Sequence, residues 1–312
     1  MKRILSCLIY ATLGLGTMEM AARIDDAVNE GAPMWRPYTI QSVFQPSPFG
    51  REGKPNARFG KWTMNEWGYR GPSPKPDRIN VITFGASETF GIYESPDHEY
   101  PRVLEARLNE AAGTPRYNVI NLAIPGVRIG RWAYLERGIK QFQAQAVVIY
   151  PSPANYIGSE KPLCDQPTAP VPDQIGIKDR IRLTGKLEQL SKKVLPPSIM
   201  TMWREHDIAK SVQGITVMDR VPESNIQSIK TDMACAVRTA QRTGAKVVLA
   251  THATYFGSTL KDADKPMMTA WRRFYPDLKE EGFLDLEQRT NAAIKALAQE
   301  MNLPLVDVDQ AI

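Results

Sequence analysis

The sequence predicts an α/β fold, with a mainly parallel sheet of five strands between two layers of helices. Short runs of β-branched and other apolar residues alternate along the chain with longer segments whose apolar residues recur at helical spacing. Strands buried on both faces read as continuous apolar runs, and a helix between two strands makes them parallel through a right-handed crossover. Together these patterns indicate a three-layer α/β/α domain.

The expected elements follow one another from residue 77 to the end of the chain. The first strand is the run Val-Ile-Thr-Phe, and the helix after it carries Val103, Leu104 and Leu108 at helical spacing. The later strands are equally rich in Val, Ile and Leu. Strands are expected at 81–84, 117–123, 146–150, 245–250 and 303–308, and helices at 100–112, 129–143, 226–243 and 286–301.

The segment 1–24 has the pattern of a signal peptide or a membrane anchor. Two basic residues precede an apolar run at 4–16, which is typical of export. The run is shorter than the roughly 20 residues that span a bilayer, unless 17–22, with Glu19, extends it. We therefore expect an exported protein, attached to the cell membrane through this segment or released into the periplasm.

Two further segments stand outside the alternating pattern. Residues 25–76 are rich in Pro, Gly, Asn and aromatic residues and are expected to form an arm that packs irregularly or as short strands. In this arm Trp67 and Tyr69 either anchor the segment on the domain or stack on a sugar. Within the main domain, 77–312, an insertion at 156–225 interrupts the alternation and is expected to form a lid or a wall over the sheet edge.

The segment 178–194 of this insertion has the pattern of a basic amphipathic helix. Its charges either face an acidic glycan or lipid surface or form a solvated helix face. The charged residues are Lys178, Arg180, Arg182, Lys186, Lys192 and Lys193. A second irregular stretch, 255–281, is expected to border the site as well.

Composition narrows the function classes. With 312 residues and a mass of 34.9 kDa, the chain can hold one large α/β domain with insertions, or two small domains. Its net charge of +5 comes from scattered Lys and Arg residues without a basic run, so a nucleic-acid partner is not expected.

Cys164 and Cys235 can pair in an oxidising compartment or remain separate buried thiols.

Small and polar residues follow four of the expected strands. Ligands bind at the carboxyl ends of strands in an open parallel sheet, so Ser87, Gly126, Asn155 and His252 are expected to gather at one edge. If a helix begins near Glu88, the Ser87 hydroxyl lies where free N–H groups favour an anion. The alternatives are a capping serine, a turn glycine and an N-cap asparagine.

Three of these segments resemble the sequence blocks of the SGNH (GDSL-type) hydrolase superfamily. Gly85-Ala-Ser-Glu-Thr-Phe-Gly91 is similar to its nucleophile block, Asn121-Leu-Ala-Ile-Pro-Gly126 to its second block, and the strand ending at Asn155 to its third. The segment Asn65-Glu-Trp-Gly-Tyr-Arg-Gly71 resembles one that precedes the nucleophile strand in exported bacterial members. The chain departs from the family pattern at Ala86, Pro153 and Tyr156, where Asp, Gly and Asp are usual.

The resemblance implies a flavodoxin-like three-layer fold and a serine hydrolase. Ser87 would attack an ester carbonyl, and three donors would bind the developing oxyanion: the N–H groups of Ser87 and Gly126 and the side-chain amide of Asn155. Gly126 lacks a Cβ, so its backbone can approach the substrate closely.

The general base expected of such an enzyme is missing from the sequence. The family places an Asp-x-x-His block after the last strand, but Gln310 and Ile312 stand three residues after Asp307 and Asp309. Among the three histidines, His98 is expected at the surface, His206 lies in the insertion, and His252 is the only internal candidate for the base. His252 either acts directly or lines the pocket. We expect the chain to be a fragment or a natural truncation whose dyad would follow Ile312.

The sequence therefore predicts an exported SGNH-type serine esterase. The expected substrate is an acetyl or short acyl ester, carried by a carbohydrate. Two alternatives remain: an O-acyltransferase that uses the same serine to acylate a polysaccharide, and a non-catalytic glycan-binding protein. No metal or organic cofactor is expected, because the sequence has no Cys/His ligand cluster and no Gly-x-Gly-x-x-Gly loop.

Overall fold

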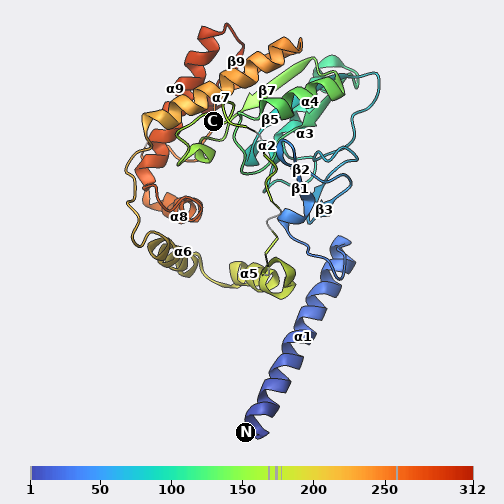
Figure 1. Cartoon of the computed structure of the whole chain (residues 1–312), viewed down its shortest axis with the longest axis vertical. Coiled ribbons are helices and arrows are strands. Elements are labelled where there is room, and N and C mark those ends of the chain that lie inside the picture. The colour runs from blue at the N-terminus through green and yellow to red at the C-terminus, as the bar shows by residue number, and fades with distance from the viewer. Residues whose placement is uncertain (1, 168, 173–174, 177, 258, 312) are drawn as a thin grey trace.

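A five-stranded parallel sheet forms the centre of the computed structural model, which describes residues 2–167, 169–172, 175–176, 178–257 and 259–311 (Figure 1). The strand order is β6-β5-β7-β8-β9, and all four neighbouring pairs are parallel. The predicted α/β class and the five-stranded sheet are confirmed. The strands are β5 (Ile79–Gly85), β6 (Tyr117–Asn121), β7 (Ala146–Tyr150), β8 (Lys246–Ala250) and β9 (Leu305–Val306).

The two faces of the sheet are covered to different extents. Ile82, Val147 and Leu249 are fully buried on the face that packs against three long helices. These helices are α4 (Trp132–Phe142), α7 (Glu223–Arg242) and α9 (Glu280–Glu300). On the opposite face α3 (Tyr100–Ala112) packs against β6, and an apolar cavity of about 680 Å³ lies between Leu104 of α3 and Val248 of β8.

The arm before the domain contains short strands, one of the two expected alternatives, and they form two antiparallel pairs. One joins β1 (Phe44–Ser47) to β2 (Gly50–Gly53), after the 3₁₀ turn η1 (Ile40–Val43), and the other joins β3 (Arg58–Phe59) to β4 (Trp62–Thr63). Phe44, Trp62 and Tyr69 are buried in the main core, so Tyr69 serves as an anchor. Trp67 is 49% exposed, with its ring edge against Phe142.

The N-terminal segment forms one helix, α1 (Lys2–Glu30), which projects from the body of the protein (Figure 1). Its part from Ile4 to Glu30 is long and apolar enough to cross a membrane, and no other helix in the described residues meets that criterion. A signal sequence would meet the same criterion. The last turns of α1 contact the insertion, so the helix is continuous with the folded body.

The insertion contains α5 (Arg182–Val194) and α6 (Pro197–Ser211), which form an arc between α1 and α8 (Lys265–Arg272) at the border of the molecule (Figure 1). The prediction for the charges of α5 was wrong at Arg182. Its side chain is 3% exposed and pairs with Asp26 of α1 at 3.5 Å, so it faces neither solvent nor a partner. The remaining short elements are η2 (Pro153–Tyr156), η3 (Lys178–Arg180), η4 (Asp262–Asp264), α2 (Ser87–Phe90) and α10 (Val308–Ala311).

Candidate active site

Ser87 is the first residue of α2, one tight turn after the end of β5. Gly85 makes that turn possible, because a Cβ there would lie 2.0 Å from Thr89 Oγ1 and 2.6 Å from the Tyr150 carbonyl oxygen. The helix α2 has only four residues, so its dipole is small. Side-chain contacts therefore set the electrostatics around the Ser87 hydroxyl, which donates a hydrogen bond to Glu88 Oε2 at 3.0 Å.

The Glu88 carboxylate connects three elements of the site. Its Oε1 accepts a hydrogen bond from Ser152 Oγ, after β7, at 3.0 Å and lies 3.7 Å from Nε2 of His252, after β8. Burial raises the pKa of Glu88, but the nearby charge of His252 and the hydrogen bond from the Ser152 hydroxyl lower it more. The carboxylate is therefore held ionised beside the Ser87 hydroxyl.

His252 is buried and fixed on several sides. Its Nδ1 lies 2.7 Å from Oε2 of Glu287 on α9, and the side chain of Glu287 is 3% exposed. The backbone N–H of His252 donates to Asn291 Oδ1 at 2.8 Å, and the Asn291 amide donates to the His252 carbonyl at 2.8 Å. The imidazole also stacks on the ring of Tyr150, with 5.3 Å between centroids.

The protonation of His252 follows from its two carboxylate neighbours. Burial lowers the pKa of His252, but the charge and hydrogen bond of Glu287 and the contact with Glu88 raise it more, so that it lies well above its ordinary value. At neutral pH the side chain is therefore an imidazolium between two carboxylates. A continuous polar chain runs from Ser87 through Glu88 and His252 to Glu287.

The sheet brings the four predicted site residues to one edge. Gly126, Ser87, Asn155 and His252 follow β6, β5, β7 and β8, which are neighbours in that order. Gly126 is exposed at the surface and has a φ of +73°, a left-handed conformation that favours glycine. Gly126 and Asn155 belong to loops that touch, because the next residue after Gly126 receives a hydrogen bond from Asn155.

Asn155 lies in η2 rather than at a helix N-cap. Its Nδ2 donates to the Val127 carbonyl at 3.0 Å, and its Oδ1 accepts a hydrogen bond from the Tyr275 hydroxyl at 3.4 Å. The amide therefore has its oxygen and nitrogen assigned by these two contacts. Since an amide nitrogen carries two hydrogens, the contact with Val127 uses one of them.

The other predicted candidates lie outside this group. His98 and His206 are exposed, as expected for His98. Asp307 forms an ion pair with Lys295 at 2.7 Å and accepts a hydrogen bond from the Thr251 hydroxyl at 2.9 Å. The backbone N–H of Asp309 donates to the same hydroxyl at 3.0 Å. Asp307 therefore fixes the end of β8, immediately before His252.

The sequence prediction assigned no role in the site to Glu88 and Glu287 of the polar chain, nor to Ser152, which donates to Glu88. Glu88 is next to Ser87 in sequence, but its contact with His252 exists only in the folded protein. Glu287 carried a signal that could have been used, because it lies one turn before Asn291 on the buried face of α9. A carboxylate on an apolar helix face needs a buried partner.

Comparison with known proteins found no matching family model and no matching curated protein. Solved structures do match. An acetyl xylan esterase, AlAXEase, is 15% identical, with a TM-score of 0.41, and the match covers 75% of this chain and 79% of that one. AlinE4, described as an SGNH-hydrolase family esterase, is 10% identical with a TM-score of 0.36, and the match covers 75% and 77% of the two chains.

A lipolytic protein of the G-D-S-L family from Desulfitobacterium hafniense DCB-2, itself described as putative, is 11% identical, with a TM-score of 0.38 and coverage of 74% and 77%. AlinE4 and this lipolytic protein are thus named as members of the SGNH and the GDSL family, respectively. With identities of 10% to 15% and TM-scores below 0.5, these likenesses carry no argument about the family or the activity of this chain.

Proposed function

We propose that this protein is a serine esterase that cleaves acyl esters, with Ser87 as the nucleophile. The observation that supports this function is the polar chain from the Ser87 hydroxyl through Glu88 and His252 to Glu287. A serine becomes a nucleophile when an adjacent group accepts its proton and a further group orients that acceptor. Glu88 and His252 meet these two requirements.

The arrangement gives each residue a role in the two-step reaction. Ser87 Oγ bonds to the acyl carbon as its proton passes to the Glu88 carboxylate, and the ester C–O bond breaks as Glu88 returns the proton to the leaving alcohol. Water then attacks the acyl-serine, again losing its proton to Glu88, and the acid leaves while Ser87 regains its proton. His252 keeps Glu88 ionised and oriented between these steps, and Glu287 holds the imidazolium in place.

This scheme assigns His252 a role through Glu88, whereas the sequence prediction considered it as the direct base. The backbone N–H groups of Ser87 and Gly126 and the Asn155 amide are proposed to bind the oxyanion. Each such donor is worth about 3–4 kcal/mol in the transition state. For the substrate we propose an acetyl or short acyl ester on a carbohydrate, met outside the cytoplasm by a protein attached to the membrane through α1.

Covalent labelling tests the proposed nucleophile. A fluorophosphonate probe should label Ser87 in the wild type and leave Ser87→Ala unlabelled, and release of acetate from p-nitrophenyl acetate should be lost in the same variant. Ser95→Ala changes an exposed serine outside the site and should be labelled like the wild type. A folded wild-type protein whose Ser87 is not labelled would contradict the proposal and favour a binding function.

A second measurement distinguishes hydrolysis from transfer. With an acylated sugar donor and an excess of unacylated glycan, an esterase yields free acid, and an acyltransferase yields newly acylated glycan through the same Ser87 intermediate. We expect free acid as the main product. Acylated glycan as the main product would replace hydrolysis by transfer and leave the role of Ser87 unchanged.

A further inference from the structure

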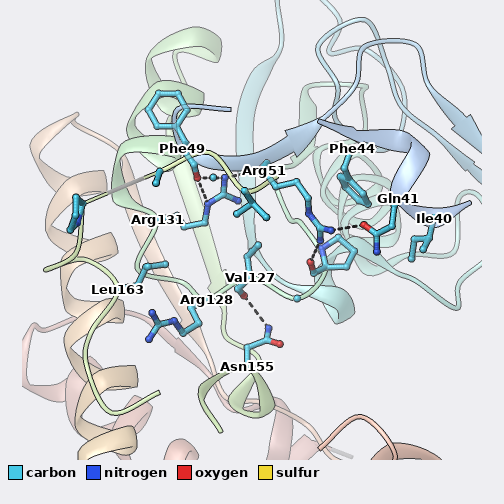
Figure 2. A pocket seen from close by; sticks show the side chains of 16 residues that line it. Ile40, Gln41, Phe44, Phe49, Arg51, Val127, Arg128, Arg131, Asn155 and Leu163 are labelled. Atoms are coloured by element: carbon cyan, nitrogen blue, oxygen red, sulfur yellow. Dashed lines mark hydrogen bonds between the residues drawn. The ribbon is translucent and has the colours of Figure 1, made fainter. Parts of the chain in front are cut away.

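A large cavity lies beside the proposed oxyanion donors. Its volume is about 720 Å³, and Gly126 and Asn155 form part of its wall. Figure 2 shows Asn155 at this wall, below Val127. The opposite part comes from the β1–β2 pair of the N-terminal arm, and another side is closed by four residues of the insertion: Leu163, Pro167, Ala169 and Val171. Segments far apart in the sequence thus enclose one space at the catalytic edge.

Three arginines line this cavity, and none of the described lining residues is acidic. Arg51 comes from β2, Arg128 from the loop after Gly126, and Arg131 from the start of α4 (Figure 2). Arg51 and Arg131 use part of their hydrogen-bonding capacity to bind backbone carbonyls. The wall therefore carries positive charge without an opposite charge on the same surface.

Arg131 is the most deeply placed of the three, with 5% of its surface exposed. Its Nε and Nη2 donate to the carbonyls of Phe49 and Arg51 at 2.6–2.8 Å, whereas Nη1 is buried without a hydrogen-bond partner among the described residues. Burial lowers the pKa of Arg131 to about 10, and the nearby charge of Arg51 acts in the same direction. A bound anion would offset both the cost of burying the Arg131 charge and its repulsion by Arg51.

Arg51 and Arg128 have donors to spare. Arg51 donates from Nη1 to Gln41 Oε1 at 2.7 Å and from Nη2 to the Pro125 carbonyl at 2.6 Å, immediately before Gly126. Arg128 donates to the Lys161 carbonyl at 2.8 Å. Because a guanidinium has five N–H groups, both can also bind an oxyanion such as a carboxylate or a phosphate.

We propose that this cavity binds an anionic group of the substrate, a carboxylate or a phosphate, next to the acyl ester. The inference rests on the proposed function, because Gly126 and Asn155 join the cavity to the place where the ester would react. It narrows the substrate class to acyl esters of acidic glycans: uronate-containing sugars if the group is a carboxylate, sugar phosphates if it is a phosphate. Arg51 and Arg128 bind the group, and Arg131 adds charge from within the wall.

Calorimetric titration of the full chain carrying Ser87→Ala tests this site without turnover. The probes are trigalacturonate, galactose 6-phosphate and neutral galactotriose. We expect at least one anionic probe to bind about tenfold or more tightly than galactotriose, and its Kd to rise with ionic strength. Which anionic probe binds more tightly identifies the carboxylate or the phosphate as the recognised group.

Arginine variants locate the binding. Arg128→Gln and Arg51→Gln, each made in the same background, should weaken binding of the anionic probe about tenfold or more, the effect of losing a charge-assisted hydrogen bond. Arg107→Gln removes an exposed arginine of α3 and should bind like the parent. Equal binding of charged and neutral probes, or no loss of affinity in either cavity variant, would overturn the inference.

The outcome is independent of the test for the nucleophile. If Ser87 is labelled by the fluorophosphonate but no anionic probe binds, the esterase proposal stands and the anion site falls. If the anionic probe binds through Arg128 but Ser87 is never labelled, the cavity is an anion site in a protein that is not a serine esterase.

Discussion

His252 and its two carboxylate neighbours show how single residues of this protein depend on one another. Glu287 is buried and Glu88 is partly exposed, so the two carboxylates have unequal surroundings. The buried one holds the imidazolium permanently, and the other lies within reach of the Ser87 hydroxyl. A charge that would be unstable alone in the interior thus becomes the means of keeping Glu88 ionised.

The pH dependence of catalysis tests this coupling. Glu88→Gln should reduce kcat/KM by about 10²–10⁴-fold, the usual contribution of a general base. In the wild type, activity should fall as pH falls through the lowered pKa of Glu88 and as pH rises through the raised pKa of His252. His252→Gln should move the acid limb to higher pH, because the charge that lowers the Glu88 pKa is gone. An unmoved acid limb in this variant would contradict the coupling.

The pair of Glu287 with His252 should stabilise the folded protein, and the direction in which this contribution changes with pH follows from the raised pKa of His252. Because the pKa of His252 is raised in the folded protein, this contribution is fully present below the unfolded value of about 6.5 and is lost as pH rises through the folded value. Glu287→Gln should therefore lower the free energy of unfolding by about 3–5 kcal/mol at acid and neutral pH and by less at alkaline pH. Urea unfolding at several pH values measures this difference.

The control lies on the same helix. Glu300→Gln removes a carboxylate that is 55% exposed and paired with Lys230, so it should change stability by about 1 kcal/mol or less at every pH. If the effect of Glu287→Gln on the free energy of unfolding were as small as this, or equally large at alkaline pH, the ionised pair of His252 and Glu287 would not be the source of the stabilisation.

Among the elements, α1 and α5 are held together by charges inside their interface. Arg182 pairs with Asp26, and its guanidinium also donates to the backbone carbonyls of Pro33 and Arg36. Lys186 binds Asp25 and Asp26 at 2.6 Å each. The basic residues at the start of α5 therefore fix the insertion to the N-terminal helix, while Lys192, near its end, makes only an exposed pair with Glu188.

Limited proteolysis tests this attachment. Arg182→Gln removes the buried guanidinium that binds Asp26 and the carbonyls of Pro33 and Arg36, which should increase the rate of cleavage within the insertion by more than about tenfold. Lys192→Gln removes a partly exposed pair on the same helix and should be cleaved at the wild-type rate. Equal cleavage rates for the two variants would show that the Arg182 contact does not hold α5.

An element can be predicted from the sequence when it depends on residues close together in the chain, and not when it depends on packing against distant segments. The five central strands are local apolar runs, so their positions could be derived from the sequence. The strands β1 to β4 have two to four residues each and depend on packing against the domain, for example of Trp62 on Phe90, so their positions in the arm could not be derived from the sequence.

The same reasoning applies to the site. Ser87, Gly126, Asn155 and His252 could be chosen because each directly follows an expected strand, and the strand order places them together. Glu287 is 35 residues from His252 in sequence, so only the packing of α9 on β8 joins them. The interpretation of Arg182 as part of an exposed basic helix face was wrong. Its partner Asp26 lies 156 residues away in sequence, so the local pattern of α5 gave no sign of the buried pair.

In the molecule as a whole, the insertion and the domain also meet at two cysteines. The backbone N–H of Cys164 donates to Asp232 of α7 at 2.9 Å, and Cys235 lies three residues further along the same helix. Both thiols are free. Burial raises the pKa of the Cys164 thiol, and the neighbouring Cys235 and Asp232 act in the same direction. The pairing of Cys164 with Cys235 stays a prediction.

Oxidation of the purified protein tests the pair. Diamide should accept the two electrons released as the Cys164–Cys235 bond forms, after which neither residue is alkylated until a reductant is added. The cross-link should raise the free energy of unfolding by about 2–4 kcal/mol. Cys7, which is exposed on α1, should react with the alkylating reagent both before and after diamide treatment, and it serves as the internal control. Alkylation of Cys164 and Cys235 after diamide treatment would contradict the prediction.

The continuity of α1 also limits where the protein can work. Its Glu19 carboxylate accepts hydrogen bonds from the backbone N–H groups of Arg182 and Leu183, so the helix reaches the body without a flexible linker. If residues 4–18 lie in a bilayer, α1 is a rigid support rather than a flexible linker. The distance between the lipid and the sheet edge that carries Ser87 is then constant. Such a protein cannot search the surrounding space for its substrate. A polymer would have to pass through the layer next to the membrane, and acyl groups beyond that layer would stay out of reach.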